Sequence, residues 1–248
     1  MKKTGLGVVI LAAGKGTRMK SDLPKVLHKV NNRPMIEYVA ESAVALAGES
    51  VYIVVGHQAE KVKKEVSRRF NVKYVLQENL LGTGDAVKEA LPLLDGDINR
   101  VLVMCGDVPL IREKTLRQLI DSHERDNNTL TVLAAQVANP TGYGRIILDD
   151  AGRITCIREE ADADEWEKSV KLVNTGIFCF DKGFLEQVIP MIKSENKQKE
   201  YYLTDAIEIA GKKGRKPGVV KADNADEMMG INTCEQLIQA EKLLKTFD

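Results

Sequence analysis

The sequence predicts an α/β protein of three layers, with a mostly parallel, mixed sheet between two layers of helices in a Rossmann-like arrangement. In the first half, short apolar runs typical of buried strands alternate with segments in which apolar residues recur at helical spacing. Such alternation builds right-handed βαβ units, whose strands run parallel. At 248 residues and 44% hydrophobic, the chain can bury a complete core. We therefore expect one domain over residues 1–248.

The first half supplies the parallel strands and their covering helices. Its four valine-rich apolar runs predict strands at residues 7–11, 51–55, 72–76 and 101–104. Three helices are expected between them, at 34–46, 58–69 and 85–91. The first begins with Pro34, a residue favoured at helix starts, and the second carries Val62 and Val66 one turn apart.

The pattern changes after a helix expected at residues 113–125. Four strands with few helices between them follow, at 130–137, 143–148, 154–159 and 171–180. We expect these to add a small antiparallel lobe over one end of the sheet. Helices return at 182–192, 206–212 and 234–245, with one strand at 218–222. No hexapeptide repeat of the kind that builds a β-helix follows the last helix.

The balance of charge excludes several classes of partner. The 36 basic residues equal the 36 acidic ones, so no net field attracts nucleic acid or an anionic membrane. The apolar segment 6–13 is too short to span a bilayer and carries no cleavage pattern, so we expect a cytoplasmic protein. The four cysteines are scattered and lie far from the three histidines, so we expect no structural zinc site.

A glycine-rich loop after the first strand is the main functional signal. Residues 11–19 read Leu-Ala-Ala-Gly-Lys-Gly-Thr-Arg-Met, and Pro24-Lys25 follows. Parallel sheets bind ligands at the carboxyl ends of their strands, where small residues let the backbone approach a nucleotide. The cations Lys15, Arg18 and Lys25 suit phosphate oxygens. The alternative is a solvated basic loop whose glycines only serve turns.

Two common phosphate-binding motifs do not fit this loop. A Walker A motif requires Gly-Lys-Ser/Thr after four spacer residues, and a dinucleotide fingerprint requires a glycine where Met19 stands. The loop therefore needs support from motifs elsewhere. These follow in order: Ser21 to Leu27, Gln77 with Leu81-Gly82-Thr83-Gly84, Gly106-Asp107-Val108-Pro109-Leu110, Asn139 to Arg145, Asn174-Thr175-Gly176, Glu200-Tyr201-Tyr202 with Thr204-Asp205, and Gly230-Ile231-Asn232.

With these motifs the sequence resembles the uridyltransferase domain of bacterial N-acetylglucosamine-1-phosphate uridyltransferases, in the nucleotide-diphospho-sugar transferase family. The resemblance implies an enzyme that joins UTP to N-acetylglucosamine 1-phosphate by direct in-line displacement of pyrophosphate, with Mg²⁺ as cofactor. It implies a nucleotide-binding half at 1–112 and a sugar-binding half, with the antiparallel lobe, at 113–248. Bifunctional relatives continue into an acetyltransferase β-helix. We expect none here, so the chain is either a free-standing enzyme or a piece of a longer one.

The resemblance also implies roles for individual residues. The catalytic residues are Arg18, Lys25 and Asp107, and the metal ligands are Asp107 and Asn232. The nucleotide-binding residues are Leu11, Ala12, Ala13, Gly14, Gly16, Thr17, Lys25, Gln77, Gly82 and Thr83. The sugar-binding residues are Thr83, Gly144, Glu159, Asn174 and Asn232. Carboxylate and phosphate oxygens are ligands that Mg²⁺ prefers, and a glutamine amide can read a pyrimidine edge.

Each of these assignments has a plainer alternative. Asp107 would form a turn, Asn232 would cap the following helix, Thr83 would cap another, and Glu159 would be a surface charge. Two departures from the family pattern fall on the sugar side. Glu160 follows Glu159 where many relatives carry lysine, and Cys105 stands where some carry tyrosine.

The sugar side and the base therefore stay open at this stage. The alternatives are an enzyme that uses another sugar 1-phosphate, a cytidylyltransferase that uses CTP, and a nucleotide-sensing module without turnover. No nucleic-acid or membrane partner is expected, and the oligomeric state is undetermined.

Overall fold

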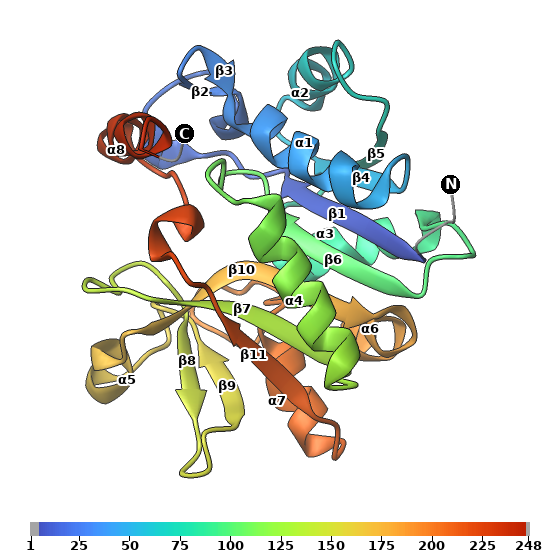
Figure 1. The fold of residues 1–248 in the computed structure, drawn as a ribbon, viewed down its shortest axis with the longest axis vertical. Helices are drawn as coiled ribbons and strands as arrows, with labels where there is room; N and C mark the ends of the chain where they lie inside the picture. Colours follow the sequence, from blue (N-terminus) through green and yellow to red (C-terminus); the bar gives the residue numbers. More distant parts are fainter. Residues whose placement is uncertain (1–4, 247–248) are drawn as a thin grey trace.

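The computed structural model describes residues 5–246 and confirms the three-layer α/β fold (Figure 1). The seven strands along the main path of its sheet are, in spatial order, β11 (Pro217–Lys221), β7 (Leu130–Gln136), β10 (Leu172–Asp181), β6 (Arg100–Cys105), β1 (Leu6–Ala12), β4 (Val51–Val55) and β5 (Lys73–Leu76). Two further strands, β8 (Arg145–Leu148) and β9 (Ile154–Arg158), branch from β10.

The sheet is parallel from β6 to β5, as the alternation of strands and helices predicts. Strand β10 runs antiparallel to both of its neighbours, β6 and β7, and it also pairs antiparallel with β8 at Val173 and Arg145. Strand β11 pairs parallel with β7. The expected antiparallel strands are therefore present, but β10 is inserted within the sheet rather than added at its end.

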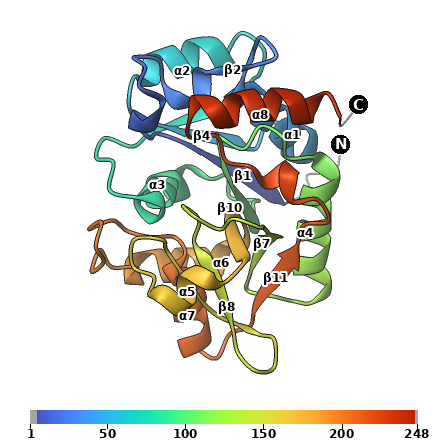
Figure 2. The same ribbon diagram turned by 90° about the vertical axis from the view of Figure 1, so that its left-hand side faces the viewer.

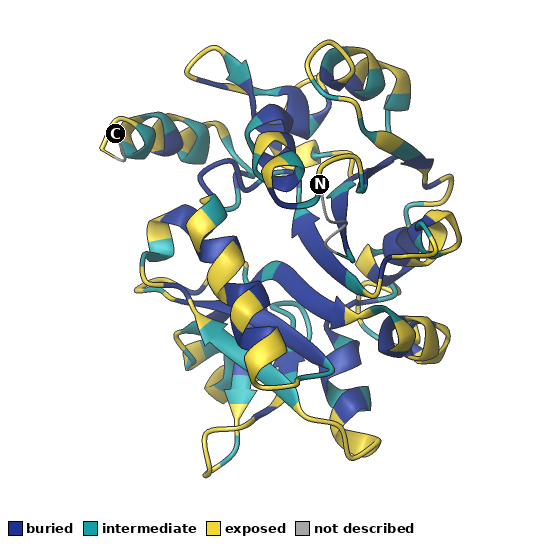
Figure 3. Cartoon of the chain, turned by 45° about the vertical axis from the view of Figure 1, so that its right-hand side comes forward, coloured by how far each residue is buried: buried dark blue, intermediate teal, exposed yellow. Residues whose placement is uncertain are grey.

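Helices cover both faces, and the buried residues form one large core on each. The first core packs against α1 (Met35–Ala47), α2 (Ala59–Val66) and α4 (Glu113–Arg125), and the second against α3 (Thr83–Ala90), α6 (Lys182–Val188) and α7 (Asp205–Lys212). Figure 2 shows α4 on one side of the strands and α3 on the other. Along β1, Val8 and Ile10 enter the first core and Val9 the second, which explains the unbroken apolar run. Accordingly, the central strands are buried and the outer sides of the helices are exposed (Figure 3).

Several predicted boundaries were wrong for local reasons. Helix α2 begins only at Ala59, because Gln58 has a left-handed φ of 53°, and it ends at Val66 rather than at 69. Helix α6 ends at Val188, where a 3₁₀ turn containing Pro190 replaces the predicted last turn. The prediction missed the short helix α5 (Glu165–Ser169), which an Asp164–Glu167 capping box stabilises.

Pro34 does not begin a helix but lies in an unpredicted hairpin of β2 (Lys29–Val30) and β3 (Arg33–Pro34). Helix α1 starts one residue later, because Pro34 has an extended ψ of 138°. The last helix, α8 (Cys234–Leu244), packs on this hairpin, where Glu241 Oε1 accepts a hydrogen bond from the Asn31 N–H at 3.2 Å. The hairpin thus holds the last helix against the segment that follows the glycine-rich loop.

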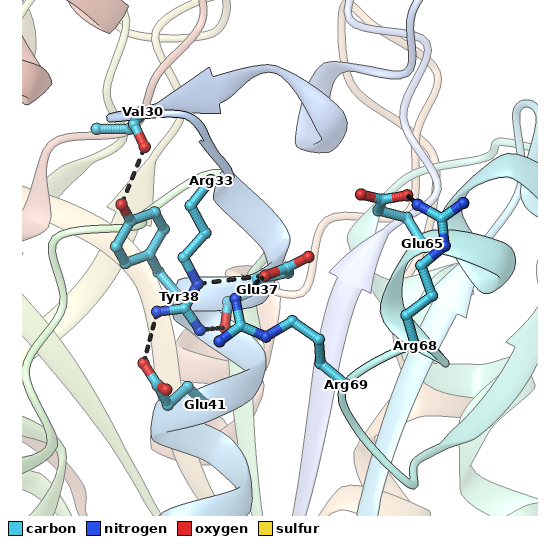
Figure 4. Close-up of polar contacts among 8 residues, drawn as sticks. All are labelled: Val30, Arg33, Glu37, Tyr38, Glu41, Glu65, Arg68 and Arg69. Atoms are coloured by element: carbon cyan, nitrogen blue, oxygen red, sulfur yellow. Dashed lines mark hydrogen bonds and ion pairs between the residues drawn. The ribbon is translucent and has the colours of Figure 1, made fainter.

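A buried carboxylate fixes the hairpin to the helices beneath it (Figure 4). Glu37 of α1 is 4% exposed, and its Oε2 lies 3.3 Å from Arg33 Nε and 2.8 Å from an Arg69 guanidinium nitrogen. The Arg33 guanidinium also lies over the ring of Tyr38, 4.5 Å from its centroid, and contacts Glu41 at 2.8 Å. One carboxylate therefore joins β3, α1 and the segment after α2.

Candidate active site

A cavity of about 260 Å³ opens at the carboxyl ends of β1 and β6 and beside the start of α3. It brings together eight of the ten predicted nucleotide-binding residues and the predicted catalytic residue Asp107. Its lining is Leu11, Ala12, Ala13, Gly14, Lys25, Val26, Gln77, Leu80, Gly82, Thr83, Ala86, Cys105, Asp107 and Glu200. Gly16, Thr17 and Arg18 lie on the adjoining loop, outside this lining.

The glycine-rich loop needs Gly16 for a backbone reason. Gly16 has a left-handed φ of 61°, and a Cβ there would collide with the side chain of Lys25. Two short 3₁₀ turns, Thr17–Met19 and Lys25–Leu27, then return the chain toward the cavity. The close packing of Gly16 on Lys25 places this lysine beside the first strand's loop.

Four side chains from three distant segments converge at the mouth of the cavity. Lys25 Nζ forms an ion pair with Asp107 Oδ2 and donates a hydrogen bond to Asn232 Oδ1 at 3.0 Å. Arg18 donates to the same Asn232 oxygen at 2.8 Å. The structure therefore brings together the predicted catalytic and metal-binding residues in one polar cluster.

Backbone hydrogen bonds hold Asp107 and Asn232 side by side. The Gly106 N–H donates to the Leu11 carbonyl at 2.9 Å, which connects the loop after β6 to the end of β1. The Ile231 N–H donates to the Asp107 carbonyl, also at 2.9 Å. The carboxylate of Asp107 pairs with Lys25 and not with its own turn, so the turn-former alternative is wrong.

Asn232 is not the helix cap that local sequence suggested. The N-cap of α8 is Thr233, whose hydroxyl accepts from the Gln236 N–H while the Gln236 side chain accepts from the Thr233 N–H. The Gln236 side chain also accepts from the Asn232 N–H at 2.7 Å. Because the capping box satisfies the helix end, the Asn232 side chain is left to face Arg18 and Lys25.

The donor set at this cluster fits a hard divalent cation. The Asp107 carboxylate and the Asn232 amide oxygen already share one cation, the Lys25 ammonium. Between residues 5 and 246 no group of three or more His, Cys, Asp or Glu side chains is arranged to bind a metal. Mg²⁺ requires few protein ligands when phosphate oxygens and water complete its shell, so one carboxylate and one amide are a suitable pair.

On the opposite wall, Gln77 and Thr83 hold fixed positions. Gln77 is 4% exposed, and its Nε2 donates to the Gly82 carbonyl at 3.1 Å and to Asp85 Oδ2 at 2.7 Å. The Thr83 hydroxyl accepts from the Leu203 N–H at 3.0 Å and does not cap α3, so the capping alternative is wrong. Gly82 has a φ of 110°, and a Cβ there would lie 2.7 Å from the Tyr201 carbonyl.

Three predicted sugar-binding residues form a second group outside the cavity lining. The Asn174 N–H donates to the Gly144 carbonyl at 2.8 Å, and a Cβ on Gly144 would lie 3.1 Å from Glu159 Oε2. Asn174 Oδ1 accepts from the Gly176 N–H at 2.9 Å within a bulge of β10. Burial raises the pKa of Glu159, whose Oε1 accepts from the Thr204 hydroxyl at 3.0 Å, so Glu159 is not a solvated surface charge.

Cys105 lies between the two groups. It lines the cavity, and its Sγ donates to the Gly176 carbonyl at 3.5 Å. Burial raises the pKa of its thiol to about 12; the charges of Asp107 and Glu159 act in the same direction, and that of Lys25 opposes them. The thiol is therefore a packing group at neutral pH and not a nucleophile.

Glu160, which stands where many relatives carry lysine, is held by contacts with the strand and loop of Arg145. Glu160 pairs with the buried Arg145 at 2.6 Å and accepts from the Gly142 N–H at 3.0 Å. These contacts fix the loop that carries Gly144. The lining residues that received no role from sequence are Val26, Leu80, Ala86 and Glu200. Val26 and Glu200 lie inside the quoted motifs, Leu80 directly before one and Ala86 two residues after it, and these positions were the only signal that could have identified them.

Comparison with known proteins matches nearly the whole chain. A model of the nucleotidyl transferase family matches residues 7–242. Proteins called "Bifunctional protein GlmU" from Pelobacter propionicus and Alkaliphilus metalliredigens are 44% and 45% identical to it over 240 residues, 97% of this chain and 52% of each relative. That of Bacillus velezensis is 44% identical over 237 residues, 96% of this chain. The chain thus spans about half the length of these relatives. Within residues 5–246, no helix has the length and apolar character to cross a bilayer.

Proposed function

Because the chain belongs to the nucleotidyl transferase family, we propose that it transfers a uridylyl group from UTP to N-acetylglucosamine 1-phosphate. The products are UDP-N-acetylglucosamine and pyrophosphate. The observation that carries this proposal is the convergence of Arg18, Lys25, Asp107 and Asn232 beside a cavity walled by the glycine-rich loop.

The geometry suits a direct displacement. An oxygen of the sugar phosphate attacks the α-phosphorus of UTP, and the bond from that phosphorus to the α,β-bridging oxygen breaks as the new P–O bond forms. Pyrophosphate leaves with the electron pair of the broken bond. No covalent enzyme intermediate is needed, and Cys105, the thiol nearest the cluster, is held protonated by its burial.

In this mechanism the cations of the cluster act on the triphosphate. Arg18 is exposed and Lys25 half-buried, so both can turn from Asn232 and Asp107 toward phosphate oxygens. Two positive charges close to the leaving pyrophosphate lower the energy of the transition state. Asp107 and Asn232 would hold Mg²⁺, which would neutralise phosphate charge when bound.

The base and the sugar would lie on opposite sides of this cluster. Gln77, Gly82 and Thr83 form the wall proposed to contact uracil, and Gly144, Glu159 and Asn174 form the group proposed to contact the sugar. The identities of 44–45% with the GlmU proteins named above support the proposed reaction.

The test is pyrophosphate release over a panel of nucleoside triphosphates and sugar 1-phosphates with Mg²⁺. We expect the highest kcat/KM with UTP and N-acetylglucosamine 1-phosphate. CTP preferred over UTP would favour a cytidylyltransferase, and another preferred sugar would replace the acceptor. Saturable UTP binding without product from any acceptor would reject an enzymatic role.

A further inference from the structure

The cavity wall contains a buried carboxylate for which the proposed mechanism has no use. Asp85 is in the first turn of α3, 8% exposed, and its Oδ2 accepts the 2.7 Å hydrogen bond from Gln77 Nε2. The N-terminal position in the helix favours a negative side chain there. Burial of a charged group is costly without a specific partner, so this contact calls for an explanation.

Only one orientation of the Gln77 amide is compatible with its surroundings. Asp85 Oδ2 and the Gly82 carbonyl both lie within hydrogen-bond distance of Nε2, and both are acceptors. If the amide were reversed, its oxygen would face two other oxygens and lose both hydrogen bonds. The carboxylate therefore forces the nitrogen toward α3.

The rest of the loop keeps this arrangement rigid. The Gln77 N–H donates to the Val55 carbonyl at 2.8 Å at the end of β5, and the Gly84 N–H donates to the Tyr201 carbonyl at 2.8 Å. The Tyr201 N–H also donates to the Leu81 carbonyl at 2.7 Å, and there is no room for a Cβ on Gly82 against the Tyr201 backbone. Gln77 and Asp85 are thus held at a fixed separation by backbone contacts on both sides.

The remaining polar atom of Gln77 is its carbonyl oxygen. Oε1 accepts no hydrogen bond from the part of the chain that the structure describes, and Gln77 lines the cavity. At Gln77 the wall therefore presents an acceptor and not a donor. Uracil offers a donor, N3–H, on its pairing edge, whereas the N3 of cytosine is itself an acceptor.

We propose that Asp85 is a positioning residue that sets the preference for uracil over cytosine by fixing the amide orientation of Gln77. This inference rests on the proposed function, because it assigns the base to this wall. Where Gln77 Oε1 faces N3 of the base, it pairs with the N3–H of uracil, whereas the N3 of cytosine brings a second acceptor and both groups are left unpaired.

The test compares UTP with CTP in the wild-type protein and in two variants. Asp85→Asn keeps an acceptor oxygen of the same shape and should preserve the ratio of kcat/KM for UTP to that for CTP within about threefold. Asp85→Leu has the same branched shape, with a larger volume, but no acceptor. It should lower kcat/KM for UTP about tenfold, mainly through KM, and leave CTP almost unchanged, the effect expected of one lost hydrogen bond.

The outcomes separate this inference from a structural role and from the proposed function. An equal fall for UTP and CTP in Asp85→Leu, or a ratio unchanged from that of the wild type, would overturn it. Circular dichroism and thermal unfolding establish that the variants are folded. Dissociation constants for UTP and CTP give the same ratio without turnover, so a wild-type protein that binds UTP but makes no product defeats only the proposed function. A protein that binds neither nucleotide defeats both.

Discussion

Replacement of Gly176 by alanine tests the packing between the bulge of β10 and the cavity. Gly176 has a left-handed φ of 77°, which costs an alanine about 1–2 kcal/mol. Its new Cβ would also lie 2.6 Å from Cys105 Sγ, well inside contact distance, and overpacking of this kind costs about 1–3 kcal/mol. We expect Gly176→Ala to lower the free energy of unfolding by about 2–5 kcal/mol, measured by urea denaturation.

A double-mutant cycle separates the two contributions. In a Cys105→Ala background the steric part should vanish, so Gly176→Ala should cost only about 1–2 kcal/mol. Gly152→Ala is the matched control, because Gly152 has a φ of 74° and none of the described atoms lies within 4 Å of a Cβ placed there. Equal costs for Gly176→Ala with and without Cys105, or equal costs at positions 176 and 152, would refute the packing argument.

Three further predictions concern charge. Glu37→Ala should lower the free energy of unfolding in urea by about 1.5–3 kcal/mol, because it removes charged hydrogen bonds but leaves Arg33 paired with Glu41. Arg69→Ala, at a half-exposed position, should cost about 1 kcal/mol or less, and similar costs would contradict a buried clamp. Burial raises the pKa of Asp205 to about 6, so the folded state binds the proton more tightly than the unfolded state and stability should fall as pH rises from about 4 to 6. Asp205→Asn should flatten that slope in urea titrations, and an unchanged slope would assign it to other groups. Asp107→Ala should abolish pyrophosphate release with an unchanged circular dichroism spectrum, and turnover near the wild-type rate would reject Asp107 as a metal ligand.

The sequence was sufficient for the parallel half of the fold because β1, β4 and β6 contain long apolar runs, with helical spacing between them. Strand β4 at Val51–Val55 and helix α4 at Glu113–Arg125 have the predicted bounds. The hairpin of β2 and β3 was not predictable, because two-residue strands leave no periodic pattern and tertiary contacts of Arg33 hold them in place. Proline is frequent at the first position of helices, but here the extended backbone of Pro34 delays the start of α1 to Met35.

In the site, too, local motifs were predictable and contacts between distant residues were not. The loop after β1 was visible as a motif, but its partnership with Asn232 depends on the capping box of α8, which frees the asparagine side chain. The residues next to Asp85 in the sequence do not indicate its contact with Gln77, because the turn between β5 and α3 brings the two side chains together. The chemical roles assigned to these residues remain predictions for the assays described above.

The position of β10 determines the order in which the sheet can be completed during synthesis. Strands β6 (100–105) and β7 (130–136) follow one another in the chain. In the sheet, β10 lies between them, and it is synthesised about forty residues later. Until β10 arrives, β6 presents an unpaired hydrophobic edge, which is the kind of surface that associates with other chains. A nascent or truncated chain that stops before residue 172 should therefore aggregate or require a chaperone, whereas one that includes residue 181 can close its central sheet.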